Sequence, residues 1–100
     1  MKRLTVKLRA APWSITWPAK LPPPDRDAHG TCKRRNQADG SKGGLIRIDG
    51  SATDRIRMET EIHEIMHACL WDLDEAAVSE TARDMAKALW KIGYRIPPVA

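Results

Sequence analysis

Two histidines four residues apart, His63 and His67, are the residues best suited to chemistry in this sequence, and Glu64 lies between them. On a helix, residues four apart project from the same face, so both imidazoles can bind one metal ion. Glu64 lies about 100° around the helix from His63, so its carboxylate can reach a metal-bound water without being a ligand. The spacing therefore predicts a metal site with a general base beside it.

A third ligand is needed, because catalytic zinc takes three protein ligands and keeps a fourth position open. If the chain turns back near residues 73–74 as an antiparallel hairpin of helices, Glu80 comes level with His67. The same arithmetic brings Asp84 level with His63. One of these carboxylates can bind the metal while the other accepts a ring N–H of a ligating histidine. We expect Zn²⁺ on His63, His67 and Glu80, with Asp84 as the supporting partner or the alternative third ligand.

This pattern resembles that of the zincin metallopeptidases, and specifically the gluzincin branch with its thermolysin-like enzymes. The resemblance rests on HExxH at 63–67 and ExxxD at 80–84, and it covers residues 45–95 at most. It implies a zinc-dependent peptidase with Glu64 as general base and Asp84 orienting the first histidine. It also implies that the strand Leu45–Asp49 is the edge strand that pairs with an extended peptide or protein substrate. Residues 89–95 are similar to the ends of small, mostly uncharacterised HExxH proteins of phages.

One zincin branch is excluded by the sequence, and the residue that would stabilise the oxyanion has only nominees. Leu70 and Leu73 stand where the metzincin motif needs a glycine and a third histidine, which excludes that branch. Such enzymes often stabilise the oxyanion with a tyrosine or histidine, and the nominees here are His29 and Tyr94.

A second set of candidate ligands keeps a non-catalytic function open. His29 and Cys32 have the spacing of half a structural zinc site, and His63 with His67 would complete the set. The protein would then be a zinc-stabilised module that binds nucleic acid or protein, with the basic residues 33–47 as the contact for nucleic acid. A metal-free scaffold protein is a third interpretation. We favour the peptidase, because the zinc-stabilised module gives Glu64 no role.

The histidines lie on a predicted helix that begins at a cap within 51–54 and runs to about Trp71. A second helix is predicted from a cap at Asp74 to about Ile92, and Gly93 is a natural stop. These two antiparallel helices form the predicted metal-binding half of the chain, residues 51–95.

Residues 1–50 have the pattern of strands and loops. Alternating apolar and polar residues, or runs rich in β-formers, predict strands at Arg3–Arg9, Trp13–Trp17, His29–Arg35 and Leu45–Asp49. Turn-forming residues in the segment 36–44 predict a loop or hairpin tip. The predicted fold class is α+β: a minimal zincin-like domain, 1–100, with a short, mainly antiparallel sheet followed by two helices.

Composition narrows the function classes. The chain has 100 residues and a net charge of +4, and 42% of its residues are hydrophobic, which fits one globular domain. Residues 1–50 hold eleven Lys/Arg against four Asp/Glu, whereas residues 51–100 hold six against nine. No apolar run is long enough for a membrane span or a secretory signal, and the two cysteines, Cys32 and Cys69, are too few for a disulfide framework. We therefore expect a cytoplasmic protein without a membrane partner.

Overall fold

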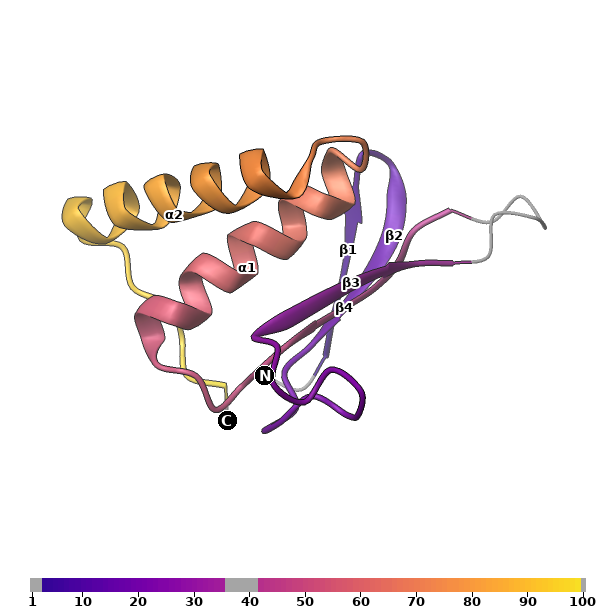
Figure 1. Cartoon of the computed structure of the whole chain (residues 1–100), viewed down its shortest axis with the longest axis horizontal. Helices are drawn as coiled ribbons and strands as arrows, with labels where there is room; N and C mark the ends of the chain where they lie inside the picture. Colours follow the sequence, from indigo (N-terminus) through magenta and orange to yellow (C-terminus); the bar gives the residue numbers. More distant parts are fainter. Residues whose placement is uncertain (1–2, 36–41, 100) are drawn as a thin grey trace.

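The computed structural model describes residues 3–35 and 42–99, and its elements follow the predicted order of strands before helices (Figure 1). The elements are β1 (Arg3–Leu8), β2 (Ala11–Thr16), β3 (Gly30–Arg34), β4 (Gly44–Ile48), α1 (Asp54–Cys69) and α2 (Glu75–Ile92). The α+β fold class is confirmed, because a four-stranded, mostly antiparallel sheet precedes two helices. The predicted loop falls largely on residues 36–41, which lie outside the described residues.

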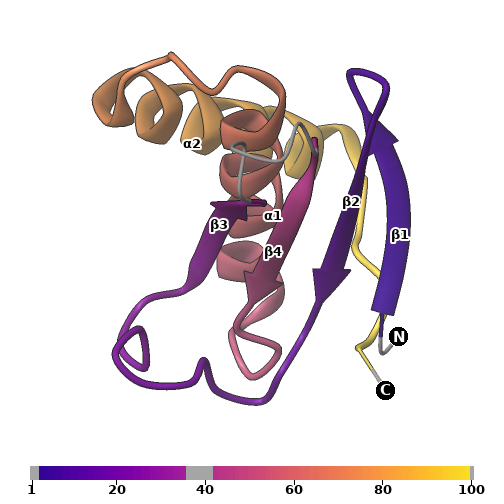
Figure 2. The ribbon, with the colours of Figure 1, turned by 90° about the vertical axis from the view of Figure 1, so that its right-hand side faces the viewer.

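The sheet has the strand order β1-β2-β4-β3, which runs from right to left in Figure 2. β2 pairs with β4 in parallel, and the other two pairings are antiparallel. The prediction that Leu45–Asp49 forms an edge strand is wrong, because β4 lies between β2 and β3. β4 carries two fully buried isoleucines, whereas β3 has the sequence Gly-Thr-Cys-Lys-Arg, so the more apolar strand takes the interior position and the more polar one the edge.

One face of the sheet holds the core. The side chains of Trp13, Ile15, Ile46 and Ile48 form a buried cluster on this face. Ile65 and Ala68 pack against the cluster from α1, which contacts β3, β4 and β1. Because strand side chains alternate between faces, the residues between these positions lie on the opposite, more polar face. The core therefore fixes α1 on the sheet and, with it, the direction of the histidines.

The second helix packs on α1, and Figure 1 shows it on the side of α1 away from the sheet. Its start is confirmed at the Asp74 cap, whose carboxylate accepts a hydrogen bond of 2.8 Å from the Ala77 N–H. Its end is confirmed at Gly93, whose φ of 118° is a left-handed conformation that glycine adopts without strain. None of the described helices is long and apolar enough to cross a membrane.

Candidate metal centre

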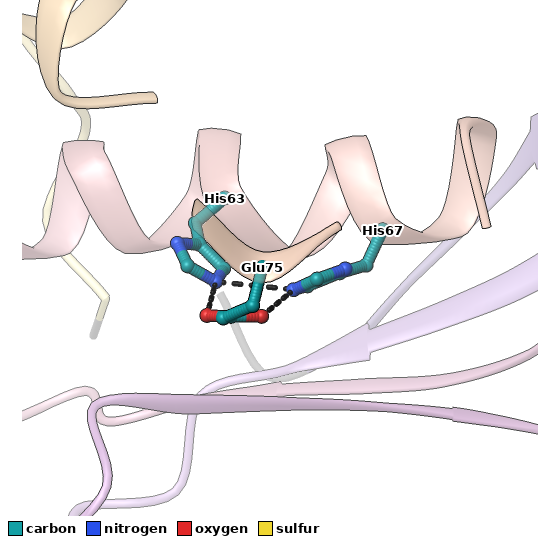
Figure 3. Close-up of side chains that lie close together, drawn as sticks. All are labelled: His63, His67 and Glu75. Atoms are coloured by element: carbon teal, nitrogen blue, oxygen red, sulfur yellow. Dashed lines mark hydrogen bonds and ion pairs between the residues drawn. The ribbon is translucent and has the colours of Figure 1, made fainter. Parts of the chain in front are cut away.

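His63 and His67 project from the same side of α1, as the four-residue spacing predicts, and their Nε2 atoms lie 3.1 Å apart (Figure 3). The carboxylate of Glu75 lies across both rings. Its Oε1 is 2.9 Å from Nε2 of His63, and its Oε2 is 2.8 Å from Nε2 of His67. Glu75 is the first residue of α2, so the turn between the helices brings this carboxylate to the histidines.

The chemistry of this group fits a metal ion. Two imidazole nitrogens and a carboxylate oxygen lie within 4.8 Å of one another, the group of three candidate ligands found among the described residues. Ligand atoms that share one tetrahedral zinc at 2.0–2.1 Å are about 3.3 Å apart, close to the 3.1 Å between the two Nε2 atoms and within the 4.8 Å that spans the group. His63, His67 and Glu75 would hold such an ion, and a fourth position would remain for water or substrate.

The structure does not bring Glu80 or Asp84 to the histidines. Both are exposed on α2, and neither belongs to the group. Val78, Ala82 and Ala86 form the buried side of α2. Glu80 is two residues from Val78 and from Ala82, which turns its side chain about 200° from each of them. From the sequence, only the distance of each residue from the turn between the helices could be compared. That distance gives the height of Glu80 and Asp84 along the hairpin, but not the direction in which their side chains point.

Glu64 is almost fully buried, with 7% of its surface exposed. Burial, together with the nearby negative charge of Glu75, raises the pKa of the Glu64 carboxyl to about 7. Within the described part of the chain, no side chain or backbone N–H donates a hydrogen bond to this carboxylate. The position that the sequence assigned to the general base is therefore a desolvated carboxyl beside the candidate ligands.

Gly30 permits a close approach of β3 to Glu64. A Cβ atom at Gly30 would lie 2.6 Å from Cγ2 of Thr60 and 3.0 Å from Oε2 of Glu64. Real Cβ contacts are essentially never shorter than 3.0 Å, so a side chain here would force β3 away from α1. The edge strand thus forms a wall directly over the carboxylate.

A cavity of about 560 Å³ opens at this wall. Residues 30–33 of β3 line one side, and His63, Glu64 and His67 line another. Trp71, Leu73 and Glu75 complete the lining from the turn between the helices and the start of α2. An open cavity beside three candidate ligands and a buried carboxyl is the arrangement that a hydrolytic metal site requires.

The alternative ligands His29 and Cys32 do not join His63 and His67 in a ligand group. Cys32 lines the same cavity of about 560 Å³ as His63 and His67, and burial and the negative charge of Glu64 raise the pKa of its thiol to about 12. His29 is exposed and lines a smaller cavity of about 310 Å³ with His63, Glu64 and Glu75. Tyr94 is also exposed, and it lines neither cavity. Of the two oxyanion nominees, only His29 is near the site.

In comparisons with protein-family models, with curated proteins and with solved structures, nothing matches this chain. The zincin resemblance therefore stays a prediction from the two motifs. Any assignment of function rests on the geometry of the site.

Sequence reasoning missed two residues of the site, Glu75 and Gly30. The sequence places Glu75 in the first turn of the second helix. An acidic residue is stabilising there because of the helix dipole, so its position needs no role in a site. Its proximity to the end of the first helix was the available signal, because a short turn brings the last turn of one helix near the first turn of the next. Gly30 begins an otherwise ordinary strand, and a glycine at such a point often marks a close approach of backbone to another element.

Proposed function

We propose that this protein is a zinc-dependent peptidase in which His63, His67 and Glu75 hold the metal and Glu64 is the general base. One observation carries the proposal: two imidazole nitrogens and a carboxylate converge at separations of 2.8–3.1 Å in a cavity that also contains a buried, donor-free carboxyl. A structural role for the metal does not call for that carboxyl, whereas hydrolysis does.

Zinc, when bound, polarises the scissile carbonyl and lowers the pKa of a bound water. The Glu64 carboxylate accepts the proton of the attacking water and later donates it to the leaving amine. Because no N–H of the described residues occupies its oxygens, the carboxylate is available for this transfer. Its burial between α1 and β3 also limits the number of orientations that the Glu64 side chain can take, so the proton acceptor stays in one place.

The edge strand β3 supports a peptide as the substrate. β3 pairs with β4 on one side only, so its outer N–H and C=O groups can pair with an extended chain. Residues 30–33 of this strand line the cavity that contains the candidate ligands. An extended peptide added beside β3 would pass its backbone carbonyls along the metal site, which favours a peptide over a compact small molecule.

The ligand set is tested by metal binding. We expect zinc titrated into chelator-stripped protein to bind in a 1:1 ratio, and Glu75→Ala to weaken binding more than the roughly 10- to 100-fold loss that outer-shell partners cause. Glu80→Ala is the matched control on the same helix, and its affinity should equal that of the wild type. A loss in Glu80→Ala with none in Glu75→Ala would overturn the assignment of Glu75.

Catalysis is tested separately. The zinc-loaded protein should cleave a mixture of extended peptides, and Glu64→Gln should lower kcat/KM by about 10²- to 10⁴-fold, the usual contribution of a general base. Zinc content of Glu64→Gln should remain stoichiometric, and Glu80→Gln should keep full activity. Equal activity of Glu64→Gln and wild type at equal zinc content would sink the proposed function.

A further inference from the structure

A second cavity, of about 500 Å³, adjoins the candidate metal site. Trp71 and Leu73 line both cavities, so the two share a wall made by the turn between the helices. The second cavity lies at the other end of β3, where Arg34 lines it, whereas Gly30 at the start of β3 lines the metal-site cavity. A chain that lies along β3 would therefore run from the metal-site cavity to Arg34, at the rim of the second cavity.

The second cavity has a positively charged rim. Of the described residues, Arg9, Arg34 and Lys42 line it, and Asp72 supplies the one carboxylate. Trp13, of which 4% is exposed, supplies an apolar floor. The rim and floor together suit a group that combines a negative charge with a short apolar stem, as a glutamate or aspartate side chain does.

Contacts made by two of the cations hold them at the cavity. The guanidinium carbon of Arg34 lies 4.1 Å from the ring centroid of Trp71, a cation–π contact across the shared wall. Arg9 Nη1 donates a hydrogen bond of 3.2 Å to the carbonyl of Cys69. Arg9 and Ala10 form the two-residue turn of the β1–β2 hairpin with φ values of 50° and 66°, where glycine or asparagine is the usual choice. The turn thus keeps an arginine at this position at some cost in backbone strain.

We propose that this cavity is a carboxylate-binding subsite, which selects peptide substrates with a negative charge a few residues from the cleaved bond. The inference rests on the proposed function for the position of the cleaved bond, but not for binding itself. From Gly30 to Arg34 a strand extends about 13 Å, so the carboxylate belongs about two to four residues from the bond beside the metal. The carboxylate comes from an acidic side chain or from the end of the peptide.

A peptide fits the site better than a nucleic acid does. The cations rim a recess with an apolar floor that continues into the metal cavity, whereas nucleic acid binding usually needs a row of cations along an open surface. The three cations surround one recess and do not continue as a track along the surface, so a phosphate backbone would gain few further contacts beyond it.

The test compares peptides that differ in one charge. Each set has three peptides with an amidated C-terminus that differ only in carrying Glu, Gln or Lys at one position. In successive sets this position lies two, three or four residues from the cleaved bond, on either side. A fourth peptide has no acidic residue but a free terminal carboxylate, so it separates the two sources of the charge. For the wild type we expect kcat/KM to be about tenfold higher for Glu than for Gln at one of these positions, since each partly exposed cation contributes about two- to fivefold.

The variants assign that preference to the cavity. Arg34→Gln and Lys42→Gln should each lower the Glu-to-Gln ratio by about two- to fivefold, and Arg34→Glu should make the Lys peptide better than the Glu peptide. Lys87→Gln, which removes the same charge from the exposed side of α2, should keep the ratio of the wild type. A ratio that is unchanged in Arg34→Gln, Lys42→Gln and Arg34→Glu overturns the subsite.

A binding measurement keeps this result apart from that of the proposed function. Fluorescence anisotropy of the labelled peptides on zinc-loaded Glu64→Gln protein should give the same order, Glu over Gln, even if no peptide is cleaved by the wild type. If neither binding nor cleavage distinguishes Glu from Gln, the subsite is refuted whatever the activity. If a short single-stranded DNA binds more tightly than the Glu peptide and loses affinity in Arg34→Gln, the cavity is a phosphate site and the peptide proposal fails.

Discussion

Two glutamates three residues apart on α1, Glu61 and Glu64, face the sheet in opposite environments. Glu61 Oε2 accepts a hydrogen bond of 2.9 Å from Nε1 of Trp17 and one of 3.2 Å from Nε of Arg57, a side chain that is itself buried and also donates to the carbonyl of Pro97. Glu64 is more deeply buried, yet among the described residues no group donates a hydrogen bond to it.

The difference separates a structural carboxylate from a reactive one. Oε2 of Glu61 joins Trp17, the residue after β2, to α1 and compensates the charge of Arg57, which in turn holds the C-terminal segment at Pro97. Glu64 makes no such connection, and its raised pKa reflects burial without compensation. A carboxyl in a cavity with a shifted pKa is a candidate for function, whereas a carboxylate that accepts hydrogen bonds and pairs with a cation usually maintains the fold. Substitutions at the two positions should therefore have opposite effects on stability.

The largest effect is expected at Glu61. We predict that Glu61→Ala lowers the free energy of unfolding by about 3 kcal/mol, because it leaves the buried Arg57 guanidinium without its counter-charge. Urea denaturation of the metal-free protein measures it, with Glu59→Ala as control. The double variant Arg57→Met/Glu61→Leu should recover most of the loss, since a buried ion pair can often be replaced by apolar groups. Equal stability of Glu61→Ala and Glu59→Ala would contradict this account.

Gly30→Ala tests how closely β3 packs against Glu64. The new methyl group would meet Thr60 Cγ2 and Glu64, so we expect a loss of about 2 kcal/mol in the free energy of unfolding, typical of an overpacked interface. Thr60→Ser removes the atom that lies nearest, and in combination with Gly30→Ala it should restore part of the stability. Additive losses in a double-mutant cycle would show that the two residues do not touch.

Glu64→Gln should act in the opposite direction. In metal-free protein at pH 8, we predict a gain of about 1 kcal/mol in the free energy of unfolding, because the buried charge disappears while the shape of the side chain is kept. Glu61→Gln, measured under the same conditions, should lose stability. A loss in both variants would mean that Glu64 has donors in solution that the structure does not show.

The smallest effect concerns Asp49, a carboxylate that is buried as Glu64 is. Hydrogen bonds from the hydroxyl and N–H of Ser51 outweigh burial and lower the pKa of Asp49 below its usual value. A lowered pKa in the folded state stabilises the protein above the unfolded value of about 4, and this contribution is lost as the pH falls towards the folded pKa. Ser51→Ala should thus cost about 0.5 kcal/mol at pH 7, since the Ser51 N–H remains, and less at pH 3. Thermal unfolding at both pH values measures it, and an equal cost at both would contradict the assignment.

The parts of the fold that the sequence predicts are those set by neighbouring residues. The Asp74 cap, the Gly93 stop and the pair His63 and His67 each depend on a few residues along one helix. The interior position of β4 depends instead on the order in which distant strands pair, which alternation of apolar residues does not encode. The choice between Glu75 and Glu80 depends on how α2 is rotated against α1, and that rotation is set by the packing of Val78, Ala82 and Ala86.

The position of Glu75 at the start of α2 has a consequence for the order in which the molecule comes apart. On the proposed ligand set, zinc bridges α1 to the one element that lies away from the sheet. Zinc at a hundredfold excess over its Kd then adds about 2.7 kcal/mol to the docking of that helix. Amide hydrogens of Val78 and Ala82 should exchange markedly more slowly with zinc than without, while those of Ile46 in the sheet change less. The zinc concentration would thus determine how often α2 separates from α1, as well as whether the site can act.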